Sequence, residues 1–194
     1  MKTLLYSCLV IVTITLAGQS WASQFEEGAA YFFYHLEMKD KKSFTAINTV
    51  IHAVESVQED QVIYHELVII DDNSENGYKN GIHLGVRIYD AEALREHQDI
   101  RKKFSQCESL GGSIDQMIIQ VEGVEQTIDV CFLSGESVNK LLPEQEEDGS
   151  LIKMLGISDQ VPTGVALVLL ETADRTMVLI TYLGKKKISV DEKK

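Results

Sequence analysis

Two apolar segments near the C-terminal end constrain the fold of this 194-residue chain more than any other feature. Residues 165–171 and 177–183 are apolar at successive positions, so neither shows the polar alternation of a strand with one face in water. Asp174-Arg175 between them supplies a turn. Because a hairpin that is apolar on both faces needs cover on both sides, we place this pair in the middle of a sheet.

Four further segments have the composition of strands. Residues 61–70 and 82–89 flank a polar loop, and residues 113–121 and 124–133 flank a short turn at Glu122-Gly123. Strands that are joined by short connections pair in antiparallel fashion. The chain therefore predicts an antiparallel sheet that is built from strand pairs.

Helical spacing of apolar residues marks the remaining elements. Apolar side chains recur three and four positions apart in residues 25–36 and again in residues 44–57, where Ser43 can act as the N-cap. A third helix is expected after Asp90, and a short one near residues 138–142. The apolar face of the third helix comprises Ala93, His97, Ile100, Phe104 and Cys107. We therefore predict an α+β fold in which helices pack on the sheet.

The first 22 residues have the pattern of a secretory signal peptide. Lys2 precedes an apolar run from Leu4 to Leu16, which is shorter than the roughly 20 residues of a membrane-spanning helix. Ser20-Trp21-Ala22 places small residues where signal peptidase cleaves. We expect an exported protein, periplasmic or secreted, with residues 23–194 as a single domain, a frayed tail from about residue 185 and no membrane span after cleavage. The alternative is an uncleaved N-terminal anchor.

Export also determines the expected state of the cysteines. Cys8 lies in the signal segment, and the two that remain, Cys107 and Cys131, predict one disulfide in an oxidising compartment. Such a bond would close a loop of about 25 residues and contribute roughly 3 kcal/mol. The alternative is a pair of buried free thiols. Because Cys131 points away from the apolar face of its strand, the bond requires cover on both sheet faces or a segment after Phe104 that wraps the sheet edge.

The acidic balance of the chain limits its partners. The formal net charge is −12 at pH 7, whereas a nucleic-acid binder needs a basic surface to displace counterions from phosphate. The sequence has no linear catalytic motif, and we expect no cofactor. We therefore expect an interaction protein, such as an inhibitor, an immunity-type protein or an accessory subunit, whose charge would attract a basic protein partner. The candidate partner-binding residues are Glu144, Glu146, Glu147 and Asp148.

Two other functions remain open at this stage. A carrier of a small ligand or a lipid would use an apolar cavity between the sheet and the helices. A hydrolase would have catalytic residues that are scattered along the chain and meet only in the fold.

Two patterns bear on metal binding, and we expect no metal site from either. Asp72, Ser74 and Asn76 match the first half of a calcium loop, but His83 stands where the bidentate Glu belongs. His65 and His83 lie on strands that can pair, so they can approach each other across the sheet. No third ligand is evident beside them in the sequence.

Overall fold

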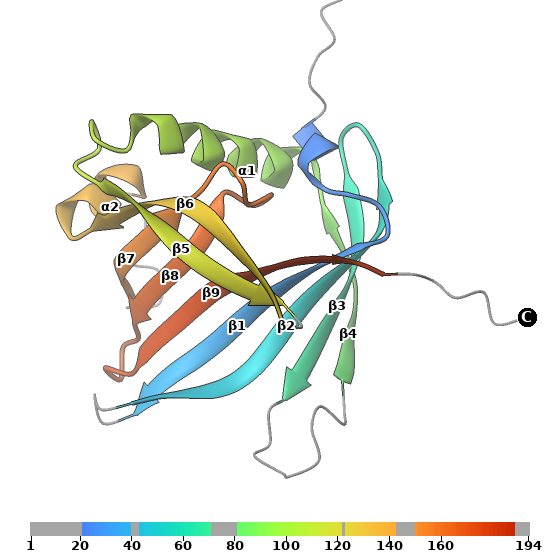
Figure 1. Ribbon diagram of the computed structural model, residues 1–194, viewed down its shortest axis with the longest axis horizontal. Helices are drawn as coiled ribbons and strands as arrows, with labels where there is room; N and C mark the ends of the chain where they lie inside the picture. Colours follow the sequence, from blue (N-terminus) through green and yellow to red (C-terminus); the bar gives the residue numbers. More distant parts are fainter. Residues whose placement is uncertain (1–20, 40–42, 71–80, 122, 143–149, 189–194) are drawn as a thin grey trace, which may run out of the picture.

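The computed structural model describes residues 21–39, 43–70, 81–121, 123–142 and 150–188. Within these ranges, nine strands form one antiparallel sheet in the order β4-β3-β2-β1-β9-β8-β7-β6-β5 (Figure 1). The strands are β1 (Ala29–Lys39), β2 (Ser43–Val57), β3 (Val62–Ile70), β4 (Gly81–Tyr89), β5 (Ser113–Val121), β6 (Val124–Ser134), β7 (Leu151–Ile157), β8 (Val165–Glu171) and β9 (Met177–Lys187). The helices are η1 (Trp21–Gln24), α1 (Ala91–Lys103), η2 (Phe104–Gln106) and α2 (Glu136–Leu141).

The predicted α+β class is wrong, because the described chain is mostly strand and α1 is its only helix of more than two turns. Residues 25–36 and 44–57, which we expected as helices, contribute mainly to β1 and β2. Both strands carry apolar side chains on both faces, so the period of two disappears and helical spacing arises by coincidence. Their many Val, Ile, Thr, Phe and Tyr residues favour strands. Bulges between His35 and Leu36, and between Val54 and Ser56, shift the pattern further.

The other predicted elements are confirmed, although α1 ends at Lys103, so Phe104 and Cys107, which we expected on its apolar face, lie beyond it. The strand pairs β3–β4, β5–β6 and β8–β9 are all present, and β9 occupies the fifth position of the nine-stranded sheet, as its two apolar faces predict. Asp90 caps α1 by accepting from the backbone N–H groups of Glu92 and Ala93, at 3.1 and 2.9 Å. Strand β7 was not predicted. Strand β9 continues to Lys187, beyond the point at which we expected the tail to fray.

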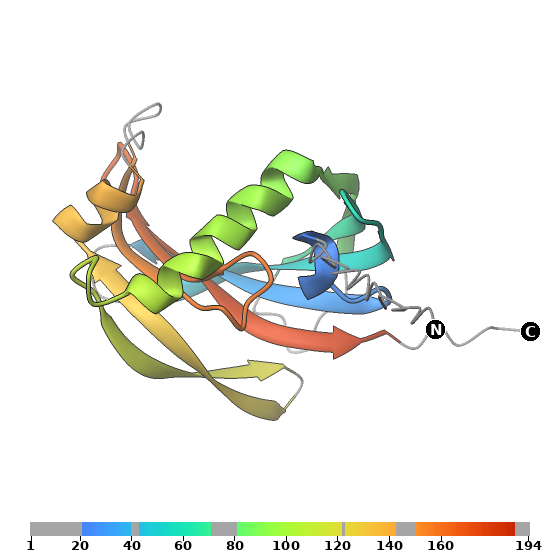
Figure 2. The same cartoon turned by 90° about the horizontal axis from the view of Figure 1, so that it is seen from above.

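The sheet curves strongly. Its β5–β6 end returns across β9, and α1 and the β5–β6 hairpin lie at opposite sides of the molecule with the sheet between them (Figure 2). Two buried clusters fill the interior. The larger cluster includes Ala22, Phe25, Tyr31, Val54, Tyr64, Leu94, Ile119, Ile128, Ala166 and Tyr182. The smaller comprises Cys107, Cys131, Leu133, Val138, Leu155 and Ile157.

The cysteines of the smaller cluster lie at disulfide distance, with their Cα atoms 5.7 Å apart, and both are buried. Val130 and Cys131 are both fully buried, although neighbouring strand residues point to opposite faces. Strand β6 is therefore covered on both sides here, which is the first of the two conditions for the predicted pairing. A side chain at Gly112 would lie 2.9 Å from Cys107 Sγ, so glycine is needed for this close approach.

Candidate functional site

The candidate site lies where the curved sheet comes back on itself without closing. Strand β9 pairs with β8 only as far as Thr181, whereas its pairing with β1 continues to Lys187. Within the described residues, the edge of β9 beyond Thr181 has no ladder partner on the β8 side. The end of the β5–β6 hairpin lies against this edge (Figure 1). We call the gap between the hairpin end and residues 182–187 the seam.

Gly184 permits the hairpin to approach β9. Its φ of +132° is a conformation that L side chains rarely adopt, and a β-carbon there would lie 2.9 Å from Val121 Cγ2 and 3.7 Å from Ile119 Cδ1. Any side chain at this position would therefore push the hairpin away from β9.

Three cavities of about 650, 160 and 540 Å³ follow the seam and adjoin one another. The first and second share Val121 and Leu183, and the second and third share Gln126 and Lys185. We call these three adjoining cavities together the seam groove. Its largest cavity alone has the volume of a typical small-molecule site.

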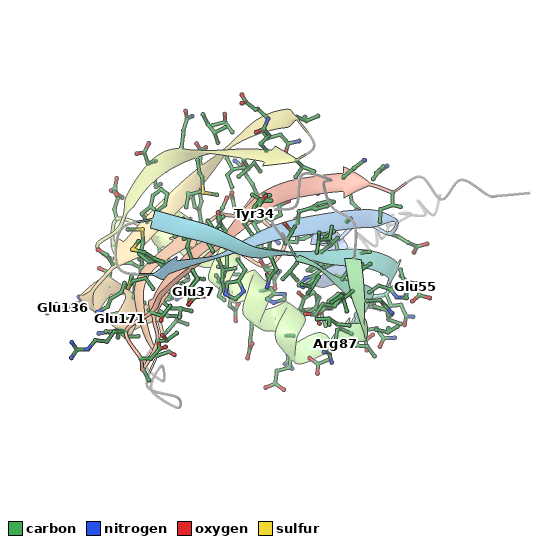
Figure 3. The ribbon with its side chains drawn as sticks, turned by 90° about the horizontal axis from the view of Figure 1, so that it is seen from below. Tyr34, Glu37, Glu55, Arg87, Glu136 and Glu171 are labelled. Atoms are coloured by element: carbon green, nitrogen blue, oxygen red, sulfur yellow. A yellow bond between two sulfur atoms is a disulfide. The ribbon has the colours of Figure 1, made fainter. Side chains whose placement is uncertain are left out.

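The largest cavity is chiefly apolar and aromatic. Its apolar and aromatic lining comprises Phe32, Tyr34, Ile51, Ile69, Val121 and Leu183. Phe32 lies directly opposite Ile51 in the β1–β2 ladder, and Phe32 follows the buried Tyr31, so both point away from the α1 side of the sheet. Figure 3 views this outer face, with Tyr34 labelled and α1 behind the sheet.

The other two cavities carry positive charge, and the third has a mostly polar lining. Lys185 and Lys186 line the middle cavity, and Lys187 follows them at the end of β9. Lys185 donates a hydrogen bond to the Glu26 carboxylate, which lowers the pKa of Glu26. The Glu26 backbone N–H donates to the Tyr31 hydroxyl at 2.9 Å, which fixes the segment after η1 beside the groove. Three consecutive lysines therefore stand at the seam of a chain whose net charge is −12.

A second constellation lies under α1, among aromatic rings. The Tyr89 hydroxyl and His52 Nδ1 lie 3.0 Å apart, at hydrogen-bond distance, and the rings of Tyr64 and Tyr89 stack with centroids 4.5 Å apart. Burial lowers the pKa of His52 to about 4 and also lowers the pKa of His97. Burial raises the pKa of Tyr89. All of these groups are neutral near pH 7, so we interpret the cluster as a packed polar core.

The structure does not test most of the predicted site residues. The acidic segment Glu144, Glu146, Glu147 and Asp148 and the calcium-loop candidates Asp72, Ser74 and Asn76 lie outside the described residues. His65 and His83 do meet, with His65 Nδ1 3.0 Å from His83 Nε2. In the described part of the chain, no group of three or more metal-binding side chains converges.

The sequence did not reveal the seam groove, because it depends on sheet curvature. One usable signal was the two-sided apolar pattern of residues 29–39 and 43–57, which as strands place Phe32, Tyr34 and Ile51 together on one face.

None of the helices in the described ranges is long and apolar enough to cross a membrane.

Comparison of the chain with protein-family models and with curated proteins finds no match. The function must therefore be argued from the chemistry of the site.

Proposed function

We propose that this protein is an exported carrier, which binds an amphiphile with an extended hydrocarbon chain and an anionic head group in the seam groove. The observation that carries the proposal is that an apolar cavity and a lysine-lined cavity adjoin at Val121 and Leu183. An apolar cavity of about 650 Å³ adjoins a cavity lined by Lys185 and Lys186. A ligand with an apolar end and a negative end matches both parts at once.

The hydrocarbon chain would lie on the outer face of β1 to β3. Burial of each methylene contributes about 0.8 kcal/mol, so ten methylenes would contribute roughly 8 kcal/mol before the loss of ligand motion is subtracted. Phe32, Ile51 and Leu183 are all only partly buried in the free protein, so they have surface left to cover.

The head group would lie at the lysines of β9. Lys185 is already paired with Glu26, so a bound anion would join an existing ion pair at the surface. The lysines attract a negatively charged head group at this place, whereas the net negative charge of the chain would repel it elsewhere. A neutral or cationic amphiphile of the same chain length lacks this contribution.

The test is calorimetric titration with laurate, dodecanol and dodecyltrimethylammonium. We expect laurate to bind most tightly. Ile51→Ser should weaken laurate binding about tenfold, since one buried aliphatic side chain contributes about 1.5 kcal/mol or more. Ile118→Ser is the control, because Ile118 is likewise a β-strand isoleucine but is 69% exposed and does not line the groove.

Lys185→Gln/Lys186→Gln tests the head-group end and should reduce the preference for laurate over dodecanol, whereas Lys102→Gln on α1 should not. The proposal fails if none of the three amphiphiles binds, or if Ile118→Ser weakens binding as much as Ile51→Ser.

Export belongs to this proposal and has its own support. The buried cysteine pair at disulfide distance and the signal-like first 22 residues both suit an oxidising, extracytoplasmic compartment, periplasmic or secreted. The intact mass of the exported protein should equal that of a chain that begins at Ser23. A mature chain that retains Met1 would contradict export by this signal.

A second candidate function is binding of another protein at strand β4. This edge strand exposes four large aliphatic side chains, between 47% and 57% exposed: Ile82, Leu84, Val86 and Ile88. Edge strands with exposed apolar residues are sites of strand addition by a partner. Val86→Lys should then abolish capture of the partner in pull-downs and leave laurate binding unchanged, which separates the two functions.

A further inference from the structure

His65 is held between two neighbouring strands, and each of these strands has a bulge at the point of contact. In the β2–β3 ladder, Val54 is opposite Tyr64 and Ser56 is opposite Ile63, so Glu55 is the extra residue. In the β3–β4 ladder, Gly85 is opposite Glu66 and His83 is opposite Leu67, so Leu84 is the extra residue.

These bulges bring two side chains to His65. Without the extra residue at Leu84, His83 would point to the face opposite His65, because side chains alternate along a strand. With the bulge, His83 shares the face of Leu67 and His65, and His83 Nε2 lies 3.0 Å from His65 Nδ1. Glu55 Oε2 lies 3.2 Å from the other ring nitrogen, His65 Nε2. Figure 3 shows Glu55 on this outer face.

We propose that His65 and His83 form a two-histidine site for a divalent transition-metal ion, with Glu55 as the residue that positions His65. Metal–nitrogen bonds are about 2.05 Å long, so two nitrogens 3.0 Å apart would subtend an angle of about 94° at a shared ion. The ring centroids are 5.2 Å apart with 40° between the planes. Each ring must turn so that both lone pairs point to one spot, and the exposure of both side chains leaves room for this and for water ligands.

Glu55 supplies the arrangement that metal-binding histidines commonly have. A carboxylate that accepts a hydrogen bond from one ring nitrogen fixes the tautomer and leaves the lone pair on the other nitrogen. Here Glu55 Oε2 lies 3.2 Å from His65 Nε2 and favours a proton on that nitrogen, which leaves the lone pair on Nδ1, the atom that faces His83. Glu55 is therefore a positioning residue and does not itself bind the ion.

The geometry favours Cu²⁺ among the divalent metals. An angle near 90° suits the tetragonal sites of Cu²⁺ and Ni²⁺ better than a tetrahedral Zn²⁺ site, and nitrogen ligands bind Cu²⁺ most tightly in the Irving–Williams order. Ca²⁺ and Mg²⁺ prefer oxygen ligands and are not expected to bind here.

The experiment is titration of the untagged protein with CuCl₂, ZnCl₂ and CaCl₂, followed by electron paramagnetic resonance of the copper complex. We expect one equivalent of Cu²⁺ to bind with two imidazole nitrogens, Zn²⁺ to bind more weakly and Ca²⁺ not to bind. His65→Ala and His83→Ala should each weaken Cu²⁺ binding at least tenfold and reduce the spectrum to one imidazole nitrogen or none.

Glu55→Ala should weaken binding about tenfold while both imidazole nitrogens stay in the spectrum, the effect that loss of an outer-shell carboxylate has at metal sites. His35→Ala and Glu96→Gln are matched controls at positions away from the pair and should leave binding unchanged. The proposal is overturned if Cu²⁺ does not bind, or if its affinity is the same in His65→Ala and His83→Ala as in the wild type. Thermal melts of all variants check that each is folded.

Discussion

The two ends of the sheet are stabilised in different ways. We call β5 to β9 the closed end, because its β5–β6 hairpin packs on β9 at Gly184, and the buried cysteine pair, Leu133 and Ile157 pack there with Val138 of α2. Strands β1 to β4 stay open. Their α1 side is packed with aromatic rings, and on their outer face the end of the β5–β6 hairpin lines one wall of the seam groove. The closed end has the features of a rigid support, and the open end offers the surface on which a ligand or a partner can lie.

The largest loss of stability is expected when the cysteine pair of the closed end is removed. Replacing Cys131 with Ser should lower the free energy of unfolding by roughly 2–5 kcal/mol, the range for a native disulfide in a small secreted domain. Denaturant unfolding of the variant, beside the wild type with and without reductant, measures the loss. If the reduced wild type is as stable as the oxidised protein, or if natively exported protein has two alkylatable thiols, the disulfide is not the support of this end.

The second largest loss of stability is expected when the packing of α1 on the open end is weakened. Leu94 is the one buried residue among the described side chains of α1, at 1% exposed. Leu94→Ala should cost about 3 kcal/mol, within the range for buried leucines, because it leaves a cavity against Phe25 and its neighbours. Glu96→Ala on the exposed side of α1 is the control and should change stability little. An equally small change at Leu94 would mean that α1 contributes little to the open end.

The contrast between the two ends also explains what the sequence could predict. Strands β3 to β6, β8 and β9 and helix α1 follow from short-range patterns and from the Asp90 cap, so they were predicted. Strands β1 and β2 belong to the open end, where apolar residues on both faces and bulges in β2 at Ile47 and Glu55 hide the period of two. In these two segments the high content of Val, Ile and Thr, which favours a strand, is a better guide than the helical spacing of the apolar residues.

The candidate sites depend on features beyond such patterns. Strand pairing suggested that His65 and His83 could approach each other, but the contacts of His65 with His83 and with Glu55 each depend on a bulge that has no signal in the local sequence. The seam groove depends on the summed curvature of the five strands from β9 to β5, which brings Val121 to Gly184 across a large separation in sequence. Curvature is the sum of many small twists, so it cannot be read from any one segment.

Acid should weaken the open end through His52. Its pKa is lowered by burial from 6.5 to about 4 in the folded protein, so between these values the unfolded chain binds more protons. Stability should therefore fall as the pH drops from about 6.5 to about 4, by at most about 3 kcal/mol from this residue. Unfolding free energies across this range for wild type and His52→Gln measure the difference in slope.

Tyr89→Phe sharpens that test. It removes the hydrogen bond to His52 Nδ1 but keeps the ring, and burial is the main cause of the lowered pKa. The pH slope should therefore persist in Tyr89→Phe and decrease in His52→Gln. The same slope in wild type and His52→Gln would assign the acid sensitivity to other groups.

The smallest effect compares one glycine from each end. Gly184 and Gly85 have similar backbone angles, with φ of +132° and +138°, but only a side chain at Gly184 would meet a neighbour, Val121 Cγ2 at 2.9 Å. Both Gly184→Ala and Gly85→Ala should lose roughly 1–3 kcal/mol from backbone strain. The additional loss in Gly184→Ala measures the contact that closes the seam, and Val121→Ala in the same chain should recover it.

Gly184→Ala should also weaken laurate binding, because the hairpin forms one wall of the seam groove, whereas Gly85→Ala should not. Equal losses for the two variants, together with unchanged laurate binding, would show that the hairpin does not need its close approach to β9.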